Sequence, residues 1–137
     1  MFGLWAGYFI LVYPPMTLKE LCKQAHQTAK DKGFWQVSKG KLKPRNQSEL
    51  LMLIVTELGE ACEALRHNNR QWINLTELGE QKLKTAGWKK DTFEDELADV
   101  FIRLGDLCEA EGIDITWQIK KKMAYNKTRP NKHGKAF

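Results

Sequence analysis

The stretch Leu-Ile-Val-Thr-Glu-Leu-Gly-Glu-Ala at 53–61 decides both the fold and the search for a site. Its apolar residues recur with the period of an α-helix, and Glu57 and Glu60 lie one turn apart on one face. A second couplet of this kind, Glu96 and Asp99, stands in a later apolar helical pattern. If the two helices pack together, four carboxylates meet, and so many like charges share a folded core only when cations lie between them.

The composition is that of one folded domain. The chain has 137 residues, 42% of them hydrophobic, and its five Trp and six Phe argue against disorder. The net charge of +5 is concentrated at residues 115–137, which carry seven Lys or Arg and no acid. Such a segment suits nucleic acid, a membrane surface or a polyphosphate ligand. Because Cys22, Cys62 and Cys108 form no CxxC pair, we expect buried free thiols and a cytoplasmic protein rather than disulfides or zinc.

Residues 1–15 form an uncharged apolar leader that stands apart from the rest of the chain. The leader is shorter than the about 20 apolar residues that cross a bilayer, and it lacks the features of a signal peptide. Three interpretations stay open: a translation start assigned too early, with Met16 as the first residue, an apolar arm that packs on the domain or on a partner, or, least favoured, a membrane anchor. We expect residues 16–137 to form a single domain.

Helical signals dominate after the leader. Caps and apolar periodicity predict four main helices: from Thr17 to about Gly33, from Asn46 or Ser48 to about His67, from an Asp91–Glu94 capping box to Gly112, and from Asp114 to before Pro130. Residues 68–90 are polar, with a short extra helix expected around 75–84. No alternating pattern predicts a strand. We therefore expect an all-α fold, a helical bundle of four main helices plus the short extra one.

The motif Thr-Glu-Leu-Gly-Glu occurs at 56–60 and again at 76–80, so either copy is a candidate for the first couplet. Small and apolar residues surround the first copy, whereas lysines and a glutamine follow the second. Burial is what makes a carboxylate cluster depend on a cation. We therefore assign the site to Glu57 and Glu60.

Neighbouring residues add to the predicted site. Glu63 lies one turn beyond Glu60 and is a possible extra ligand, and Arg103 lies one turn past Asp99, which it most simply neutralises. An all-carboxylate set of oxygens suits Mg²⁺, with Mn²⁺ as a possible substitute, whereas zinc prefers His or Cys. The three histidines show no ligand spacing, and we expect them at surfaces or helix ends.

These motifs resemble the MazG-like, all-α nucleoside triphosphate pyrophosphohydrolase family, whose signature is ExxE, a spacer and ExxD. The signature residues are Glu57, Glu60, Glu96 and Asp99, and the matching surroundings are Lys-Gly-Phe-Trp at 32–35, the stretches 53–61 and 93–100, Gly-Ile-Asp at 112–114, and Lys-Met-Ala-Tyr-Asn-Lys-Thr-Arg-Pro-Asn-Lys-His-Gly-Lys at 122–135. The 35 residues between Glu60 and Glu96 exceed the family's usual spacer, which leaves the choice of substrate open.

The resemblance implies Mg²⁺-dependent hydrolysis of a (deoxy)nucleoside triphosphate at the α-phosphate, which yields the monophosphate and pyrophosphate. It also implies a homodimer or homotetramer that completes the active site. The implied catalytic and metal-binding residues are Glu57, Glu60, Glu96 and Asp99, with Glu63 in or just outside the ligand set. The implied substrate-binding residues are Lys122, Asn126 and Arg129, which share one face of the last helix at i, i+4 and i+7, and Trp35, which lies where the family often places its base pocket.

The competing interpretation is a non-enzymatic helical module that binds nucleic acid through residues 115–137. Basic charge beside Tyr125 permits it, but it gives no reason for buried carboxylates, which would repel a phosphate backbone. We therefore expect neither a stable nucleic-acid partner nor a membrane partner. A relative acting on another phosphoanhydride would share every site residue, and the sequence leaves open the base, the sugar and the choice between dimer and tetramer.

Overall fold

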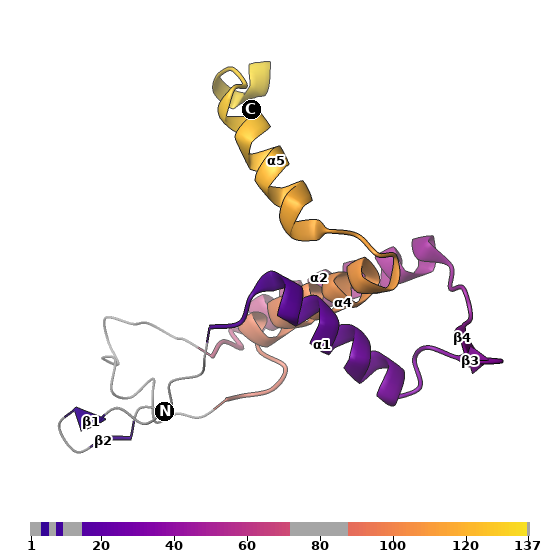
Figure 1. The fold of residues 1–137 in the computed structure, drawn as a ribbon. Coiled ribbons are helices and arrows are strands. Elements are labelled where there is room, and N and C mark those ends of the chain that lie inside the picture. The colour runs from indigo at the N-terminus through magenta and orange to yellow at the C-terminus, as the bar shows by residue number, and fades with distance from the viewer. Residues whose placement is uncertain (1–3, 6–7, 10–14, 72–87, 137) are drawn as a thin grey trace.

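The computed structural model describes residues 4–5, 8–9, 15–71 and 88–136 (Figure 1). Its elements, in chain order, are β1 (Leu4–Trp5), β2 (Tyr8–Phe9), α1 (Leu18–Asp31), β3 (Val37–Ser38), β4 (Lys41–Leu42), α2 (Gln47–Arg66), α4 (Phe93–Ala110), α5 (Ile115–Lys127) and the 3₁₀ turn Asn131–Gly134. The described chain is thus mostly helical, as predicted. The short helix expected around 75–84, the second Thr-Glu-Leu-Gly-Glu copy and most of the leader lie outside the described residues.

The starts of α1, α2 and α5 follow the capping signals of the sequence. Thr17 Oγ1 accepts a hydrogen bond from the Glu20 N–H at 3.2 Å, and the Glu20 carboxylate accepts one from the Thr17 N–H at 2.8 Å. This is the predicted capping box. Asn46 and Asp114 likewise accept hydrogen bonds from N–H groups in the first turns of α2 and α5. Three helix starts are therefore confirmed.

The predicted start of α4 is wrong by one residue. Thr92 is the N-cap, and its hydroxyl accepts a hydrogen bond from the Asp95 N–H at 3.2 Å. Asp91 has φ 61°, in the left-handed region, whereas an N-cap residue is extended. The capping function therefore falls to the next side chain along the chain.

Two short antiparallel hairpins, β1 with β2 and β3 with β4, were not predicted. The loop of the second hairpin consists of Lys39 and Gly40, whose φ angles are 51° and 74°. Two consecutive residues at positive φ are typical of the type I′ turn that closes two-residue hairpins. The strands have only two residues each, which is too few for an alternating pattern to appear in the sequence.

Helices α1, α2 and α4 pack together, with α4 in contact with both of the others. Helix α2 runs antiparallel to α4, because Gln47 at its start donates to Glu111 at 2.6 Å and the Phe93 N–H donates to the carbonyl of Asn69 at 3.0 Å. Gly105 allows α1 and α4 to approach closely: a Cβ there would lie 3.3 Å from Cα of Cys22. The result is a three-helix core that holds the acids of α2 and α4 opposite each other.

Helix α5 projects away from this core (Figure 1), and none of its residues is buried. Trp117, Met123 and Tyr125 are 52%, 58% and 57% exposed. The expectation that four main helices pack as one bundle is therefore wrong for the described part of a single chain. Three helices pack, and the fourth presents apolar and basic side chains to its surroundings.

The cysteines divide into two kinds. Cys22 and Cys108 are buried, and burial raises the pKa of both thiols. Cys62 lies on the outer face of α2 and is exposed, so the expectation of burial is wrong for this residue. No helix in the described ranges has both the length and the apolar character needed to cross a membrane.

Candidate metal centre and adjoining cavity

Three of the four predicted carboxylates converge where α2 faces α4. Glu57 and Glu60 extend from α2 and Glu96 from α4, and one oxygen of each lies within 4.8 Å of the other two. Glu57 and Glu96 are buried, at 5% and 6% exposure, whereas Glu60 is exposed. The protein therefore shields Glu57 and Glu96 from solvent, and solvent reaches the group at Glu60.

Asp99 is not a member of this group of three, but it lies beside it. It is half-buried, and its charge contributes to the raised pKa of Glu96. Because Asp99 follows Glu96 by one helical turn, it stands where the group meets the cavity described below. The four predicted acids thus occupy one region, with three in ligand-like proximity.

The electrostatics of the site favour a bound cation. Burial is the main cause that raises the pKa of Glu96, and neighbouring carboxylates, with Glu60 first, raise it further. Burial and then the charge of Glu57 raise the pKa of Asp99, while Arg103 opposes the change. The donors are all carboxylate oxygens, which are the ligands that Mg²⁺ and Mn²⁺ prefer. The residues present therefore fit the predicted metal.

Adding Mg²⁺ is expected to raise the melting temperature, and the gain should grow as the pH rises above the ordinary pKa of a carboxyl group, about 4. Glu96 and Asp99 have raised pKa values in the folded state, so without metal the stability they confer falls as rising pH ionises them. A divalent ion offsets this loss and contributes about 2.7 kcal/mol at one hundred times its Kd. Melting curves recorded in EDTA and in millimolar Mg²⁺ at a series of pH values above this point provide the measurement. Identical curves in the two conditions would contradict a clustered metal site.

Arg103 forms its ion pair with Glu57 rather than with Asp99. Its Nη2 lies 2.6 Å from Oε1 of Glu57, and the Glu57 side chain is only 6% exposed. The expectation that Arg103 simply neutralises Asp99 is thus incomplete. The more deeply buried acid gains more from a cation, since it has less solvent to screen its charge.

A cavity of about 390 Å³ adjoins the carboxylates. Asp99 and Arg103 of α4 line it, and Lys32, Phe34 and Arg45 contribute aromatic and basic character from the segment between α1 and α2. Its volume falls within the about 300–1,000 Å³ that is common for small-molecule sites. The cavity therefore provides room for an organic group beside the acids, with positive charge on its walls.

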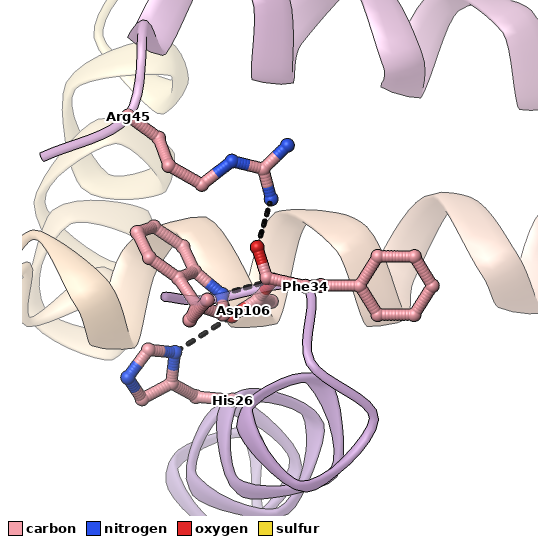
Figure 2. A network of polar contacts seen from close by, with 5 residues as sticks. His26, Phe34, Arg45 and Asp106 are labelled. Carbon is pink, nitrogen blue, oxygen red and sulfur yellow. Dashed lines mark hydrogen bonds and ion pairs between the residues drawn. The ribbon is translucent and has the colours of Figure 1, made fainter. Parts of the chain in front are cut away.

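A buried polar network fixes the segment that forms this wall (Figure 2). His26 of α1 lies with Nδ1 2.7 Å from Oδ1 of Asp106, and the Trp35 Nε1–H donates to the two Asp106 oxygens at 2.9 and 3.0 Å. Arg45 donates to the carbonyl of Phe34 at 3.2 Å and stacks over the Trp35 ring, 5.3 Å from its centre. Asp106 thus joins α1, α4 and the connecting segment.

Trp35, predicted to bind substrate, is 6% exposed. Its polar edge is occupied by Asp106 and one face is covered by Arg45. Phe34, in contrast, is 65% exposed and lines the cavity. The aromatic ring available for stacking in this arrangement is therefore that of Phe34, and Trp35 holds the wall behind it.

Asp106 and His26 are the residues that the sequence analysis missed. We expected the histidines at surfaces or helix ends, which is wrong for His26, because it is 7% exposed and bonded to Asp106. The available signal was a histidine on the apolar face of the first helix. Its partner lies 80 residues further along the chain, where no local pattern points to it.

Glu63 extends away from the group of three. Its carboxylate accepts a hydrogen bond from His67 at 2.9 Å and pairs with Arg66 at 3.4 Å, at an exposed surface. A different acidic group forms at the start of α4, where oxygens of Asp91, Asp95 and Glu96 also lie within 4.8 Å of one another. Glu96 thus belongs to both groups.

Lys122 and Asn126 lie on α5, which leads away from the three-helix core of its own chain (Figure 1), whereas Arg129 follows the C-cap Thr128, so the helix ends before it. The Lys122 ammonium and the Arg129 guanidinium lie 5.1 and 5.9 Å from the centre of the Tyr125 ring. Oδ1 of Asn126 is buried without a hydrogen-bond partner among the described residues. The structure therefore brings the predicted acids together but not the predicted phosphate-binding residues with them.

Searches with this chain against protein-family models, curated proteins and solved structures found no match. The chemistry of the site therefore has to be inferred from its own geometry. The carboxylate oxygens, the Arg103 guanidinium beside Glu57 and an adjoining cavity lined by both basic and acidic side chains together suit a ligand that carries metal-bound phosphate and an organic group.

Proposed function

We propose that this protein is a Mg²⁺-dependent nucleoside triphosphate pyrophosphohydrolase that converts a ribo- or deoxyribonucleoside triphosphate to the monophosphate and pyrophosphate. The observation that carries the proposal is the convergence of Glu57, Glu60 and Glu96 within 4.8 Å, beside a cavity that Asp99 and Arg103 line. The resemblance of the same residues to the MazG-like family supports it. A cytoplasmic location belongs to the proposal, because the cysteines are free.

The roles of the residues follow from their positions. Glu57, Glu60, Glu96 and Asp99 would hold Mg²⁺, or Mn²⁺ in its place, and Glu60 faces the solvent from which the substrate arrives. An ion held there would supply neutralisation of the phosphate charge and would lower the pKa of the water that attacks the α-phosphorus. Phe34 is placed to stack on a nucleobase in the cavity, a contact worth about 1–3 kcal/mol in comparable sites.

The proposal includes a homodimer or homotetramer. Five residues of α2 follow the alternating spacing of four and three that coiled-coil seams use, and all are exposed: Leu51, Val55, Leu58, Cys62 and Leu65. We call them the α2 stripe. A second copy of the chain would cover the α2 stripe and bring its own α5 with it. Lys122, Asn126 and Arg129 would then serve the carboxylates of a partner, since they do not reach those of their own chain.

Val55→Glu is expected to convert the oligomer to monomers, because it introduces a charge into the middle of the α2 stripe. Size-exclusion chromatography with light scattering measures the change in mass directly. Gln24→Glu, on the exposed surface of α1, adds the same charge elsewhere and should leave the mass unchanged. A wild-type protein that is monomeric at micromolar concentration would contradict the oligomer.

Pyrophosphate release from a panel of ribo-, deoxyribo- and modified nucleoside triphosphates, measured with Mg²⁺ and with EDTA, tests the function. We expect release that depends on the metal, and the ranking of the panel would identify the preferred base and sugar. No release from any nucleotide would refute the enzymatic proposal.

Nucleic-acid binding through residues 115–137 is the second candidate, and the position of α5 favours it, since this helix leads away from the core and none of its residues is buried (Figure 1). Binding of this kind weakens steeply with salt and needs no divalent metal. Salt-dependent DNA binding in EDTA, with no nucleotide turnover in Mg²⁺, would select this candidate over the hydrolase.

A further inference from the structure

Arg103 stands between the carboxylates and the cavity. Its side chain is 42% exposed, yet its Nη2 lies 2.6 Å from Oε1 of Glu57, which is 6% exposed. The same side chain lines the cavity together with Asp99. One guanidinium therefore faces a buried metal ligand and an open binding space at the same time.

Glu57 cannot serve two cations equally well. A divalent ion held by the carboxylate oxygens repels the guanidinium that shares Glu57, and this repulsion is strong where burial limits solvent screening. The guanidinium fork binds phosphate in the same two-pronged manner as it binds carboxylate. A phosphate group that entered the cavity would therefore give Arg103 an equivalent partner close to its present position.

We infer that Arg103 is the resident counter-ion of Glu57 in the metal-free protein and exchanges Glu57 for a phosphate of the substrate when metal and nucleotide bind. The second half of this inference rests on the proposed function. The exchange couples the two ligands: Arg103 opposes binding of metal alone and favours binding of metal and nucleotide together. Such coupling is reciprocal, so each ligand strengthens the binding of the other.

Arg103→Met, which keeps an unbranched apolar stem in place of the arginine methylenes but removes the charged guanidinium, tests the exchange. Binding of Mn²⁺ alone, followed by electron paramagnetic resonance of the free ion, should become roughly tenfold tighter. Binding of α,β-methylene nucleoside triphosphates in Mg²⁺, followed by calorimetry, should become roughly tenfold weaker. Opposite changes distinguish an exchanging residue from a merely structural one, whose loss would weaken both.

Lys23→Met removes one positive charge from the exposed surface of α1 and should change neither affinity. If Mn²⁺ binding is unchanged or weaker in Arg103→Met, Arg103 is not the counter-ion of Glu57. If nucleotide binding is unchanged, Arg103 does not exchange Glu57 for a phosphate. If Arg103→Met fails to fold, Arg103→Lys decides: it keeps the charge without the fork, so nucleotide binding should weaken several-fold while Mn²⁺ binding stays the same. Nucleotide binding equal to that of the wild type would then overturn the exchange.

The two proposals can fail separately. A wild-type protein that binds Mn²⁺ but no nucleotide would overturn both the proposed function and the exchange. The Mn²⁺ titration of Arg103→Met would still show whether Arg103 is the counter-ion of Glu57. A wild-type protein that hydrolyses nucleotides, with both affinities unchanged in Arg103→Met, would overturn the inference alone.

Discussion

Glu96→Gln is expected to lower kcat/KM for pyrophosphate release by roughly a thousandfold or more, since metal ions supply several kcal/mol of transition-state stabilisation. Glutamine keeps the size of the side chain but removes the charge with which Glu96 would hold the metal beside Glu57 and Glu60. Burial and the neighbouring acids raise the pKa of Glu96, so its ionised form destabilises the metal-free fold. The same substitution should therefore maintain or raise the melting temperature in EDTA while it removes the stabilisation by Mg²⁺.

Two measurements separate this outcome from simple damage to the fold. Initial rates of pyrophosphate release give the loss of activity, and melting curves with and without Mg²⁺ give the loss of metal binding. Glu49→Gln, at an exposed position in the first turn of α2, is the matched control and should retain activity. Substantial metal-dependent turnover by Glu96→Gln would show that Glu96 is not a required metal ligand.

Trp35→Ala is expected to lower the free energy of unfolding by about 3–5 kcal/mol, the usual cost of truncating a large buried aromatic side chain. The ring is 6% exposed, and its loss would also deprive Asp106 of a donor. Trp35→Phe keeps most of the ring but removes the N–H group, at a cost of about 1–3 kcal/mol. Urea unfolding, followed by circular dichroism, measures both values.

Trp88→Ala provides the comparison, because Trp88 is 75% exposed and its hydrogen bond to Asp95 is 3.3 Å long. We expect it to change the stability by less than about 1 kcal/mol. If Trp35→Phe left stability unchanged but raised KM for the nucleotide, the predicted role of Trp35 in substrate binding would be favoured over its role as an anchor.

Local signals explain what could be predicted from the sequence. The caps Thr17, Asn46 and Asp114 act within one helical turn, so the starts of three helices are encoded beside the residues that form them. Helical periodicity placed Glu57 on the same face as Ile54 and Ala61, and all three are buried. The same pattern predicted that the two carboxylate couplets lie close together, because each couplet is on the apolar face of its helix and these faces are buried when α2 and α4 pack against each other.

The features that could not be predicted depend on contacts between distant segments. His26 and Asp106 are 80 residues apart, and only the packing of α1 against α4 brings them together. The choice of Thr92 over Asp91 as cap depends on a single backbone angle. For α5, periodicity identifies apolar residues but does not say whether their neighbours belong to the same chain or to another.

The division among the cysteines makes the protein unusually convenient to label. Buried thiols of raised pKa, such as Cys22 and Cys108, react slowly because little thiolate forms and reagents do not reach it. Cys62 is the accessible thiol among the described residues, and it lies within the α2 stripe. A fluorophore or spin label can therefore be attached at Cys62 without any substitution, at the surface that we expect a second copy of the chain to cover.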